Sequence, residues 1–320
     1  AERAKLAEAE SRARSAELEQ VAEFQAEQLS EIDPKLMGVR LRRALLDAAS
    51  IDQREALTAN LAGVNFTSLA LDTLEANIFG RTFDAIDSQF ADQPLVRARL
   101  LQTASSTLVA LGLLDAATAP QEEALSIRRS VLGDDHPSTL DSIMDMGFLL
   151  EARGRHSEAE RFFREGLDGN RRVLGDDHPD TLRSIRALTH LLNARVASAR
   201  AGGEAEPLGR ALASFGAHHL DLGDHAPAEP LLAEALEALS GALPESDPLA
   251  WQVLSDLGAS IAGQGRREEA EFPLRDSAEW MLENASATSD PGEANAVVLG
   301  VAPPATVVQR MIDLYETWHE

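Results

Sequence analysis

The sequence predicts an all-α protein, a solenoid of stacked helical hairpins, and a repeated interval of 42 positions carries this prediction. The stretch LGDDHPxTL occurs at residues 132–140 and again at residues 174–182. The same interval separates two pairs of glycines, Gly112 from Gly154 and Gly223 from Gly265. A fixed interval of this length is typical of repeats in which each hairpin is too small to bury its own apolar face and must stack on its neighbours.

The composition favours the same fold class. The chain has 320 residues, of which 44% are hydrophobic but only 4% aromatic, and this suits small-residue helix contacts better than a sheet core. Its formal net charge of −24 would repel phosphates, so we expect no nucleic-acid partner. The sequence has no cysteine, which excludes disulfides, thiolate metal sites and cysteine nucleophiles.

The sequence contains no run of about 18 apolar residues, the length that a membrane helix needs. We therefore expect a soluble segment without direct membrane contact. The chain opens on AERAKLAEAE, with neither an initiator methionine nor a signal segment. We interpret it as a piece of a longer protein, and the sequence leaves its cellular location unknown.

Two segments precede the repeats. Residues 1–35 are rich in Ala, Glu, Arg and Gln, which predicts a helical connector or a weak coiled coil. Residues 36–94 are expected to form a helical adaptor, on which four large side chains recur at helical spacing: Phe79, Phe83, Ile86 and Phe90. Packing contacts are the interpretation that we favour for this stripe, and a ligand pocket is the alternative.

The repeats fall in two blocks, at residues 95–196 and 208–283, and a glycine of the 42-position pairs ends the first helix of each hairpin. Gly154 and Gly223 lie 69 positions apart, so one repeat is cut short. We expect a flexible break at residues 197–207, where ASARAGGEAEP replaces most of a second helix.

Two further segments follow the repeats. Residues 284–304 carry Ser, Thr, Gly and Pro and are expected to form a linker. Residues 305–320 are expected to form an amphipathic helix that caps the exposed end of the stack. Its apolar side chains are Val308, Met311, Ile312, Tyr315 and Trp318.

Aligned on these turns, the repeats resemble tetratricopeptide repeats of the 42-residue kinesin light chain type, over residues 95–282. The small-residue positions of that family fall on Ser105, Ala117 and Ala124; Gly147, Ala159 and Gly166; Gly216, Ala228 and Ala235; and Gly258, Ala270 and Ser277. Small residues at these points let two helices approach closely. The resemblance implies a curved array that binds polypeptides and carries no reaction centre and no cofactor.

A narrower resemblance covers VAEFQAEQLSEIDPKLMG, QFADQPLVRARLLQT and MIDLYETW. With the repeats between them, these segments are similar to the C-terminal tail of certain bacterial serine/threonine protein kinases. The resemblance implies a kinase domain and a membrane helix upstream of Ala1, which would tether this segment to a bacterial membrane. The chain itself contains no glycine-rich loop and no HRD, DFG or APE motif, so no kinase residue can be assigned in it.

Histidines supply the only metal-like patterns. His136 and His178 precede prolines in the turns between repeats, where an imidazole can cap a helix. Next to them Ser138 and Asp180, and later Asp247, are expected to cap the first helices. The stretch HHLDLGDH at 218–225 is divided between a core position and a turn, so we expect no metal there. A metal-dependent enzyme that uses His218 and Asp221 stays open as the least favoured alternative.

The resemblance also implies which side chains line the concave face. Transferring the inward positions of the first helices gives Arg99, Gln102, Asp141, Met144, Phe148, Arg183, Arg186, His190, Asn193 and Arg210. Four arginines are unexpected in so acidic a chain, and the guanidinium group suits carboxylates and phosphates. We expect the groove to bind an extended peptide with acidic or phosphorylated side chains. The alternative is that these arginines pair with the protein's own Asp and Glu.

The sequence as a whole therefore predicts a protein–protein interaction scaffold, with no catalytic, cofactor-binding or metal-binding residue in this chain. The fold implies the class of function only, because repeat scaffolds serve unrelated ligands. The rival hypothesis is a self-association module that uses the N-terminal helix.

Overall fold

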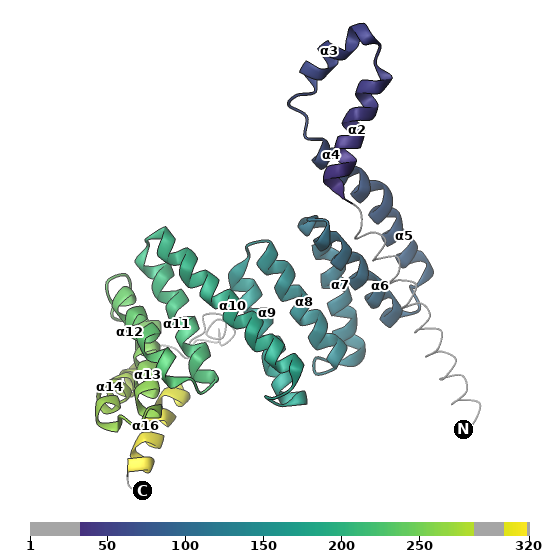
Figure 1. The fold of residues 1–320 in the computed structure, drawn as a ribbon. Helices are drawn as coiled ribbons and strands as arrows, with labels where there is room; N and C mark the ends of the chain where they lie inside the picture. The colour runs from purple at the N-terminus through teal and green to yellow at the C-terminus, as the bar shows by residue number, and fades with distance from the viewer. Residues whose placement is uncertain (1–32, 285–303, 319–320) are drawn as a thin grey trace, which may run out of the picture. The chain divides into compact units, whose positions relative to one another are not determined.

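The computed structural model describes residues 33–284 and 304–318, and throughout these residues the only regular secondary structure is helical. The chain forms two compact units, residues 1–184 and 185–320, and each is considered by itself (Figure 1). The proposed connector at 1–35 and linker at 284–304 lie almost entirely outside the described residues. No described helix is both long enough and apolar enough to cross a membrane.

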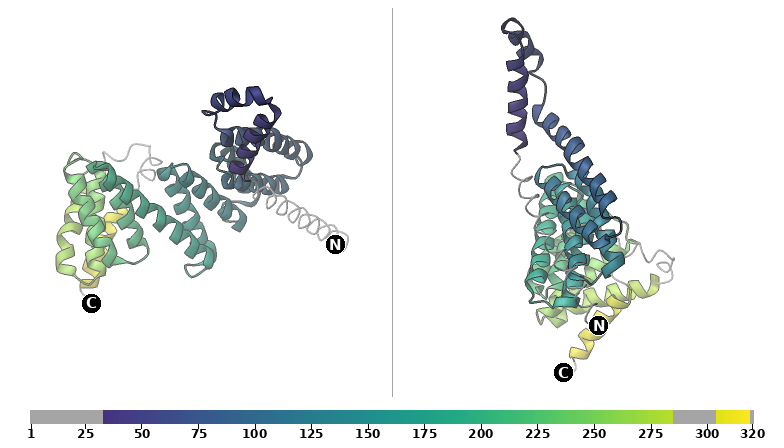
Figure 2. Two further views of the ribbon diagram at one scale, coloured as in Figure 1. Left: turned by 45° about the horizontal axis from the view of Figure 1, so that its top comes forward. Right: turned by 90° about the vertical axis from the view of Figure 1, so that its right-hand side faces the viewer.

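The first unit begins with five helical elements: α2 (Pro34–Ala48), α3 (Ile51–Asn60), α4 (Phe66–Leu74), the π-helix η1 (Glu75–Phe79) and α5 (Gly80–Gln89). Two hairpins follow, made of α6 (Pro94–Ala110) with α7 (Leu114–Leu132) and α8 (Pro137–Ala152) with α9 (His156–Leu174). Figure 2 shows the two hairpins from further sides.

Helix α10 (Pro179–Gly202) starts in the first unit and continues into the second. The second unit then has the hairpin of α11 (Ala205–Asp221) with α12 (His225–Ser240) and that of α13 (Pro248–Gly263) with α14 (Arg267–Asn284). Helix α16 (Pro304–Trp318) packs against α14 and α13, so it covers the end of this stack.

The aromatic stripe of the adaptor is a packing surface. Phe79 and Ile86 are buried, and Phe83 packs with Ile86 against α6 and α7. Their partners there are Ala98, Leu101, Ala124 and Ile127. Packing is thus confirmed for most of the stripe, although Phe79 and Phe83 also border a hollow that is considered below.

The small-residue positions have the packing role that the repeat pattern predicts. A Cβ atom on Gly147 would lie 2.5 Å from Cε1 of Phe163, and one on Gly216 would lie 2.6 Å from Cγ of Leu232. Ser105 takes the equivalent position in the first hairpin, where its hydroxyl donates a hydrogen bond to the carbonyl oxygen of Ala117 at 2.8 Å. The two helices of each hairpin therefore approach so closely that a larger side chain cannot fit between them.

The LGDDHPxTL stretch is a structural turn. Gly133 and Gly175 end their helices at φ values of 84° and 85°, a left-handed backbone that favours glycine. His136 then caps α8, because its Nδ1 accepts a hydrogen bond from the backbone N–H of Ser138 at 3.1 Å. His178 makes the same bond with Asp180 at 3.2 Å.

Two of the three expected caps were therefore wrong. Ser138 and Asp180 lie inside the first turn of their helices and donate to the capping histidines. Both helices begin at the proline that follows the histidine, one position earlier than the sequence indicated. The imidazole therefore occupies the capping position. Asp247 is a cap as predicted, since its carboxylate accepts from the N–H of Leu249 at 2.9 Å.

We expect His136→Ala to lower the free energy of unfolding by about 1 kcal/mol, the usual cost of losing a helix cap. Denaturant unfolding followed by circular dichroism measures this loss. His156→Ala is the matched control, because His156 opens α9 without capping it. Equal losses in the two variants would contradict the capping role.

The predicted flexible break at residues 197–207 was wrong. These residues are helical except Gly203 and Glu204. Alanine and arginine prolong α10 through Ala201, and the helix ends where Gly203 takes a φ of 73°. The repeat is shortened because α10 is followed directly by α11, so no separate second helix forms.

Candidate functional site

A hollow of about 390 Å³ lies within the first unit and is lined by residues of α6, α7, α8 and the start of α10. It is lined by Arg99, Gln102, Thr103, Ser106, Arg128, Ser138, Asp141, Asp145 and Arg183. We call this set the groove. Four of the residues proposed from the sequence meet here: Arg99, Gln102, Asp141 and Arg183.

Arg128 comes from α7 and forms the buried wall of the groove. Arg128 is only 5% exposed. Its Nη1 donates hydrogen bonds to the carbonyl oxygen of Ser138 at 3.2 Å and to the hydroxyl of Ser142. Burial lowers the pKa of Arg128, and the positive charge of Arg99 acts in the same direction. The carboxylates of Asp145 and Asp141 oppose this shift.

Asp145 is the acidic counterpart of Arg128. Burial raises the pKa of Asp145, while a hydrogen bond from Nε2 of Gln102 favours the ionised form. The bond joins α6 to α8, so it also fixes two neighbouring hairpins to each other. Gln102 thus has a structural role in the groove.

Arg183 reaches across the groove from α10. Its Nη2 lies 3.0 Å from Oδ1 of Asp141 and 3.8 Å from Oδ1 of Asp180. In the second unit, Nε of Arg210 lies 2.9 Å from Oε1 of Glu206. The protein's own carboxylates therefore do pair with these two arginines. Both pairs are partly exposed to water, where such contacts contribute little.

The remaining proposed residues do not line this groove. Met144 is fully buried against Gly166, and its sulfur accepts a weak hydrogen bond from the hydroxyl of Ser184 at 3.4 Å. The proposal of Met144 as a groove residue is therefore corrected: it is a core residue. Phe148 is 41% exposed and packs edge-to-face on Phe163, with ring centroids 4.9 Å apart.

Three of the proposed residues lie on α10 in the second unit and are exposed: Arg186, His190 and Asn193. Arg186 has neither an ion pair nor a hydrogen bond within the part of the chain that the structure describes. It therefore stays available to a ligand, whereas Arg210 is held by Glu206.

Sequence reasoning missed two of the charged groove residues, Arg128 and Asp145. Arg128 lies on a second helix, whereas inward positions were transferred to first helices only. Asp145 follows Asp141 by four positions, and this spacing places both on one helix face. The i, i+4 pair was the signal that could have found Asp145.

The histidine-rich stretch does not form a metal site. His218 is fully buried, and its Nε2 is 2.8 Å from the hydroxyl of Thr189. His219 instead turns towards Asp224, with Nδ1 and Oδ2 3.6 Å apart. Within residues 33–284 and 304–318 no group of three or more His, Asp or Glu side chains is arranged to hold a metal ion.

Comparison with known families identifies the repeats. Residues 97–138 and 139–180 each match the family model of the tetratricopeptide repeat. Residues 97–180 are tetratricopeptide repeats. These two matches cover α6 to α9, and equivalent close approaches at Gly216 and Gly258 recur in the hairpins α11–α12 and α13–α14.

Solved structures of several helical-repeat proteins are similar to this tetratricopeptide-repeat chain. One contains the nearly identical TPR-like repeats of a kinesin light chain from Podosopora anserina, at 17% identity and a TM-score of 0.31, covering 81% of this chain and 99% of that one. Another is BtubC from P. vanneervenii, at 17% identity and a TM-score of 0.29, covering 87% and 92%. A third is the apo quorum sensor NprR from B. thuringiensis, at 10% identity and a TM-score of 0.28, covering 88% and 96%. No curated protein matches the chain.

The identities and TM-scores of these structures are low. The fold is therefore assigned from the helix packing and from the repeat matches. Tetratricopeptide-repeat arrays are protein-interaction scaffolds, since stacked hairpins present an extended binding surface. The fold is typically non-catalytic, and it assigns no enzymatic activity to this chain.

Proposed function

We propose that the groove binds an extended polypeptide through its acidic or phosphorylated side chains. The observation that carries this proposal is the convergence of Arg99, Arg128 and Arg183 on one hollow that holds only two carboxylates. The groove is thus locally cationic in a chain of net charge −24. Because the chain as a whole carries a large surplus of carboxylates, charge favours the groove over the acidic surfaces for such a ligand.

Arg128 and Arg183 have different tasks in this mechanism. Arg128 is buried and held by Ser138 and Ser142, so it supplies a fixed positive charge at the wall. Arg183 is exposed, and its contact with Asp141 is one that a carboxylate or phosphate of a ligand can replace. Paired N–H donors of a guanidinium group bind such anions at two points, which also sets the direction of the ligand.

The groove is already shaped before a ligand arrives, because Gln102 and Asp145 join the neighbouring hairpins. Binding to a preformed surface avoids the entropy cost of ordering the receptor. An extended peptide suits this preformed surface best, since it can span successive first helices without displacing them.

Arg99→Glu together with Arg183→Glu should weaken binding of an acidic peptide by at least about tenfold, because charge-assisted hydrogen bonds contribute about 1.5–3 kcal/mol each. The probe is a set of fluorescent peptides of equal length that are neutral, Glu-rich or phosphorylated. Fluorescence anisotropy measures their affinity for the full chain.

The matched control is Arg161→Glu together with Arg267→Glu, two exposed arginines outside the groove that give the same change of net charge. Equal affinity for neutral and acidic peptides would overturn the proposal. So would unchanged affinity in the groove variant. A preference for phosphorylated over Glu-rich peptides would define the ligand further.

We also propose that this chain is the non-catalytic tail of a larger bacterial serine/threonine protein kinase. The resemblance of residues 21–38, 89–103 and 311–318 to such tails supports this proposal. The coding sequence upstream of Ala1 tests it: kinase motifs followed by an apolar segment of about 20 residues are expected. An unrelated upstream domain would remove the kinase link and leave the scaffold function unaffected.

A further inference from the structure

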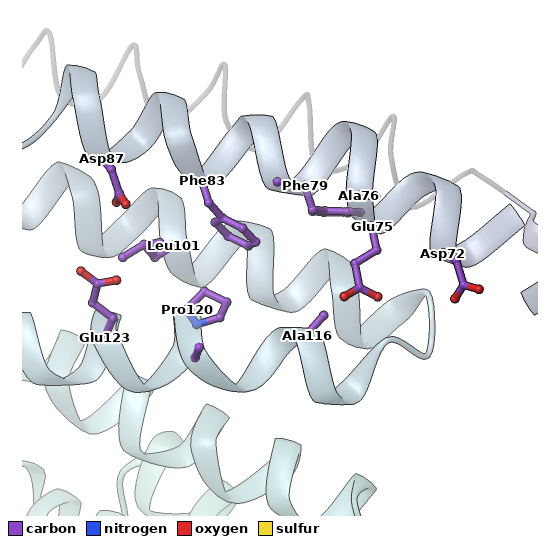
Figure 3. A pocket seen from close by; sticks show the side chains of 12 residues that line it. Asp72, Glu75, Ala76, Phe79, Phe83, Asp87, Leu101, Ala116, Pro120 and Glu123 are labelled. Carbon is purple, nitrogen blue, oxygen red and sulfur yellow. The ribbon is translucent and has the colours of Figure 1, made fainter. Parts of the chain in front are cut away.

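A second hollow of the first unit, of about 680 Å³, lies between the helical run α4–η1–α5 on one side and α6 and α7 on the other (Figure 3). Its floor is apolar and is formed by Phe79, Phe83, Leu101, Ala116, Ala119 and Pro120. Figure 3 shows Phe83, Leu101 and Pro120 in the middle, between two groups of carboxylates. We call this hollow the acidic cleft.

The carboxylates lie at both ends of the acidic cleft. Asp87 and Glu123 form one end, where Nη2 of Arg97 lies 3.0 Å from Oδ1 of Asp87 and also contacts Glu123. Asp72 and Glu75 form the other end, and neither has an ion pair within the described part of the chain. The cleft therefore offers an apolar surface next to uncompensated negative charge, which suits a ligand that is both apolar and cationic.

Helix α2 has the opposite character. It concentrates Lys35, Arg40, Arg42 and Arg43 against a single carboxylate, Asp47, although the chain as a whole has 29 Lys and Arg against 53 Asp and Glu. Among the residues that the structure describes, α2 makes an ion pair only between Nε of Arg43 and Oδ2 of Asp47, 3.8 Å apart, and both side chains are largely exposed.

The outer face of α2 is also apolar. Gly38 faces α4, because a Cβ atom there would lie 2.7 Å from the backbone nitrogen of Thr67. At 100° per residue, Leu36, Arg40 and Arg43 fall on the face opposite Gly38. Leu36 is 46% exposed, and the neighbouring Val39 is 63% exposed. This helix thus presents large aliphatic side chains and cations to water, a combination typical of a surface that docks on a partner.

We propose that the acidic cleft binds helix α2 of a second copy of this chain. Leu36 and Val39 pack on Phe83 and Ala119, while the cations of α2 meet Asp72 and Glu75. Leu36 to Arg43 spans about 10 Å of helix, and Asp72 to Asp87 about 20 Å, so the outer face fits within the cleft. When each copy gives its α2 to the other, the two contacts are equivalent and the dimer is closed.

Two charge-reversal variants test this interface in the full chain. Arg40→Glu with Arg43→Glu acts on α2, and Asp72→Lys with Glu75→Lys acts on the cleft. We expect the unaltered chain to dimerise, and each variant alone to associate at least about tenfold more weakly. Sedimentation-velocity ultracentrifugation over a range of concentrations measures both, and far-UV circular dichroism confirms that the variants are folded.

An equimolar mixture of the two variants gives the sharper result. The acidic α2 of one variant then faces the basic cleft of the other, and the remaining contact has its original charges. The mixture should therefore dimerise where each variant alone does not. Arg161→Glu with Arg267→Glu is the control that matches the charge change of the α2 variant, and it should leave association unchanged. Deletion of residues 1–32 should also leave it unchanged, which separates this interface from association through the N-terminal segment.

A chain that stays monomeric at every concentration overturns the proposal. A mixture of the folded variants that fails to associate overturns it, and so does loss of the dimer on deletion of residues 1–32. None of these outcomes depends on the peptide-binding groove, because no residue altered here lines it.

Discussion

Gly147→Val should strongly destabilise the second hairpin. The Cβ atom would lie 2.5 Å from Cε1 of Phe163, a fully buried ring that already packs against Phe148. The ring can move only by separating α8 from α9. Forcing additional carbon atoms into a close-packed core costs about 1–3 kcal/mol, and this cost should outweigh the gain in helix propensity from glycine to valine. We expect a loss at the upper end of this range, measured by denaturant unfolding.

The control is Gly202→Val, since Gly202 also lies in a helix but a Cβ atom there meets no atom within 4 Å. A second variant, Phe163→Leu in the Gly147→Val background, should recover part of the lost stability because it empties the contested space. Equal changes in stability for Gly147→Val and Gly202→Val would show that the close approach of Phe163 does not govern the position.

Arg310→Met should lower the stability of the second unit by about 3 kcal/mol at neutral pH, because it leaves a buried carboxylate without its cation. Nη1 of Arg310, on α16, contacts Oδ1 of Asp256 on α13 and lies 3.2 Å from the hydroxyl of Ser255. The Asp256 side chain is only 6% exposed, and Gln252 donates a further hydrogen bond to it at 2.8 Å. Thermal unfolding at several pH values measures the effect.

The stability lost in Arg310→Met should depend on pH. Burial raises the pKa of Asp256, and Arg310 opposes the shift, so the pKa should rise further in Arg310→Met. A carboxyl group with a raised pKa binds its proton more tightly in the folded state than in the unfolded state. The stability lost at neutral pH should therefore return as the pH falls through the raised pKa towards the ordinary value of about 3.9.

Asp256→Asn in the Arg310→Met background removes the titrating group and should abolish this pH dependence. Persistence of the same pH dependence in the double variant would assign it to another carboxylate. An Arg310→Met variant as stable as the original chain would mean that α16 is held by its apolar contacts alone. Those contacts are made by Val307 and Leu314.

The 42-position interval predicted the fold class correctly. It led to a wrong prediction where one repeat is shorter than the others. Glycines at the turns and small residues at the helix contacts are local requirements of a hairpin, so each is visible in the sequence. Residues 197–207 were predicted to be flexible because they contain two adjacent glycines. Only the second glycine has a positive φ, and the preceding alanines and arginine simply lengthen α10. Composition does not distinguish a long helix with a glycine stop from a loop.

The candidate site was only partly predictable for a related reason. Arg99, Gln102, Asp141 and Arg183 were found because the resemblance implies which positions of the first helices face inward. Arg128 enters the same groove from a second helix, and Met144 turns into the core. Both placements depend on how neighbouring hairpins pack. The spacing of residues along one helix carries no information on that packing.

By itself the sequence determined that this protein is a helical-repeat scaffold without cysteine chemistry, because repeat length, turn glycines and composition act locally along the chain. The tertiary structure decided which charges meet. It placed Arg128 and Asp145 in one groove, buried Asp256 under Arg310, and left the cations of α2 exposed on a different surface from the carboxylates of the acidic cleft. Charge interactions depend on distance and burial in space, and neither is fixed by position in the sequence.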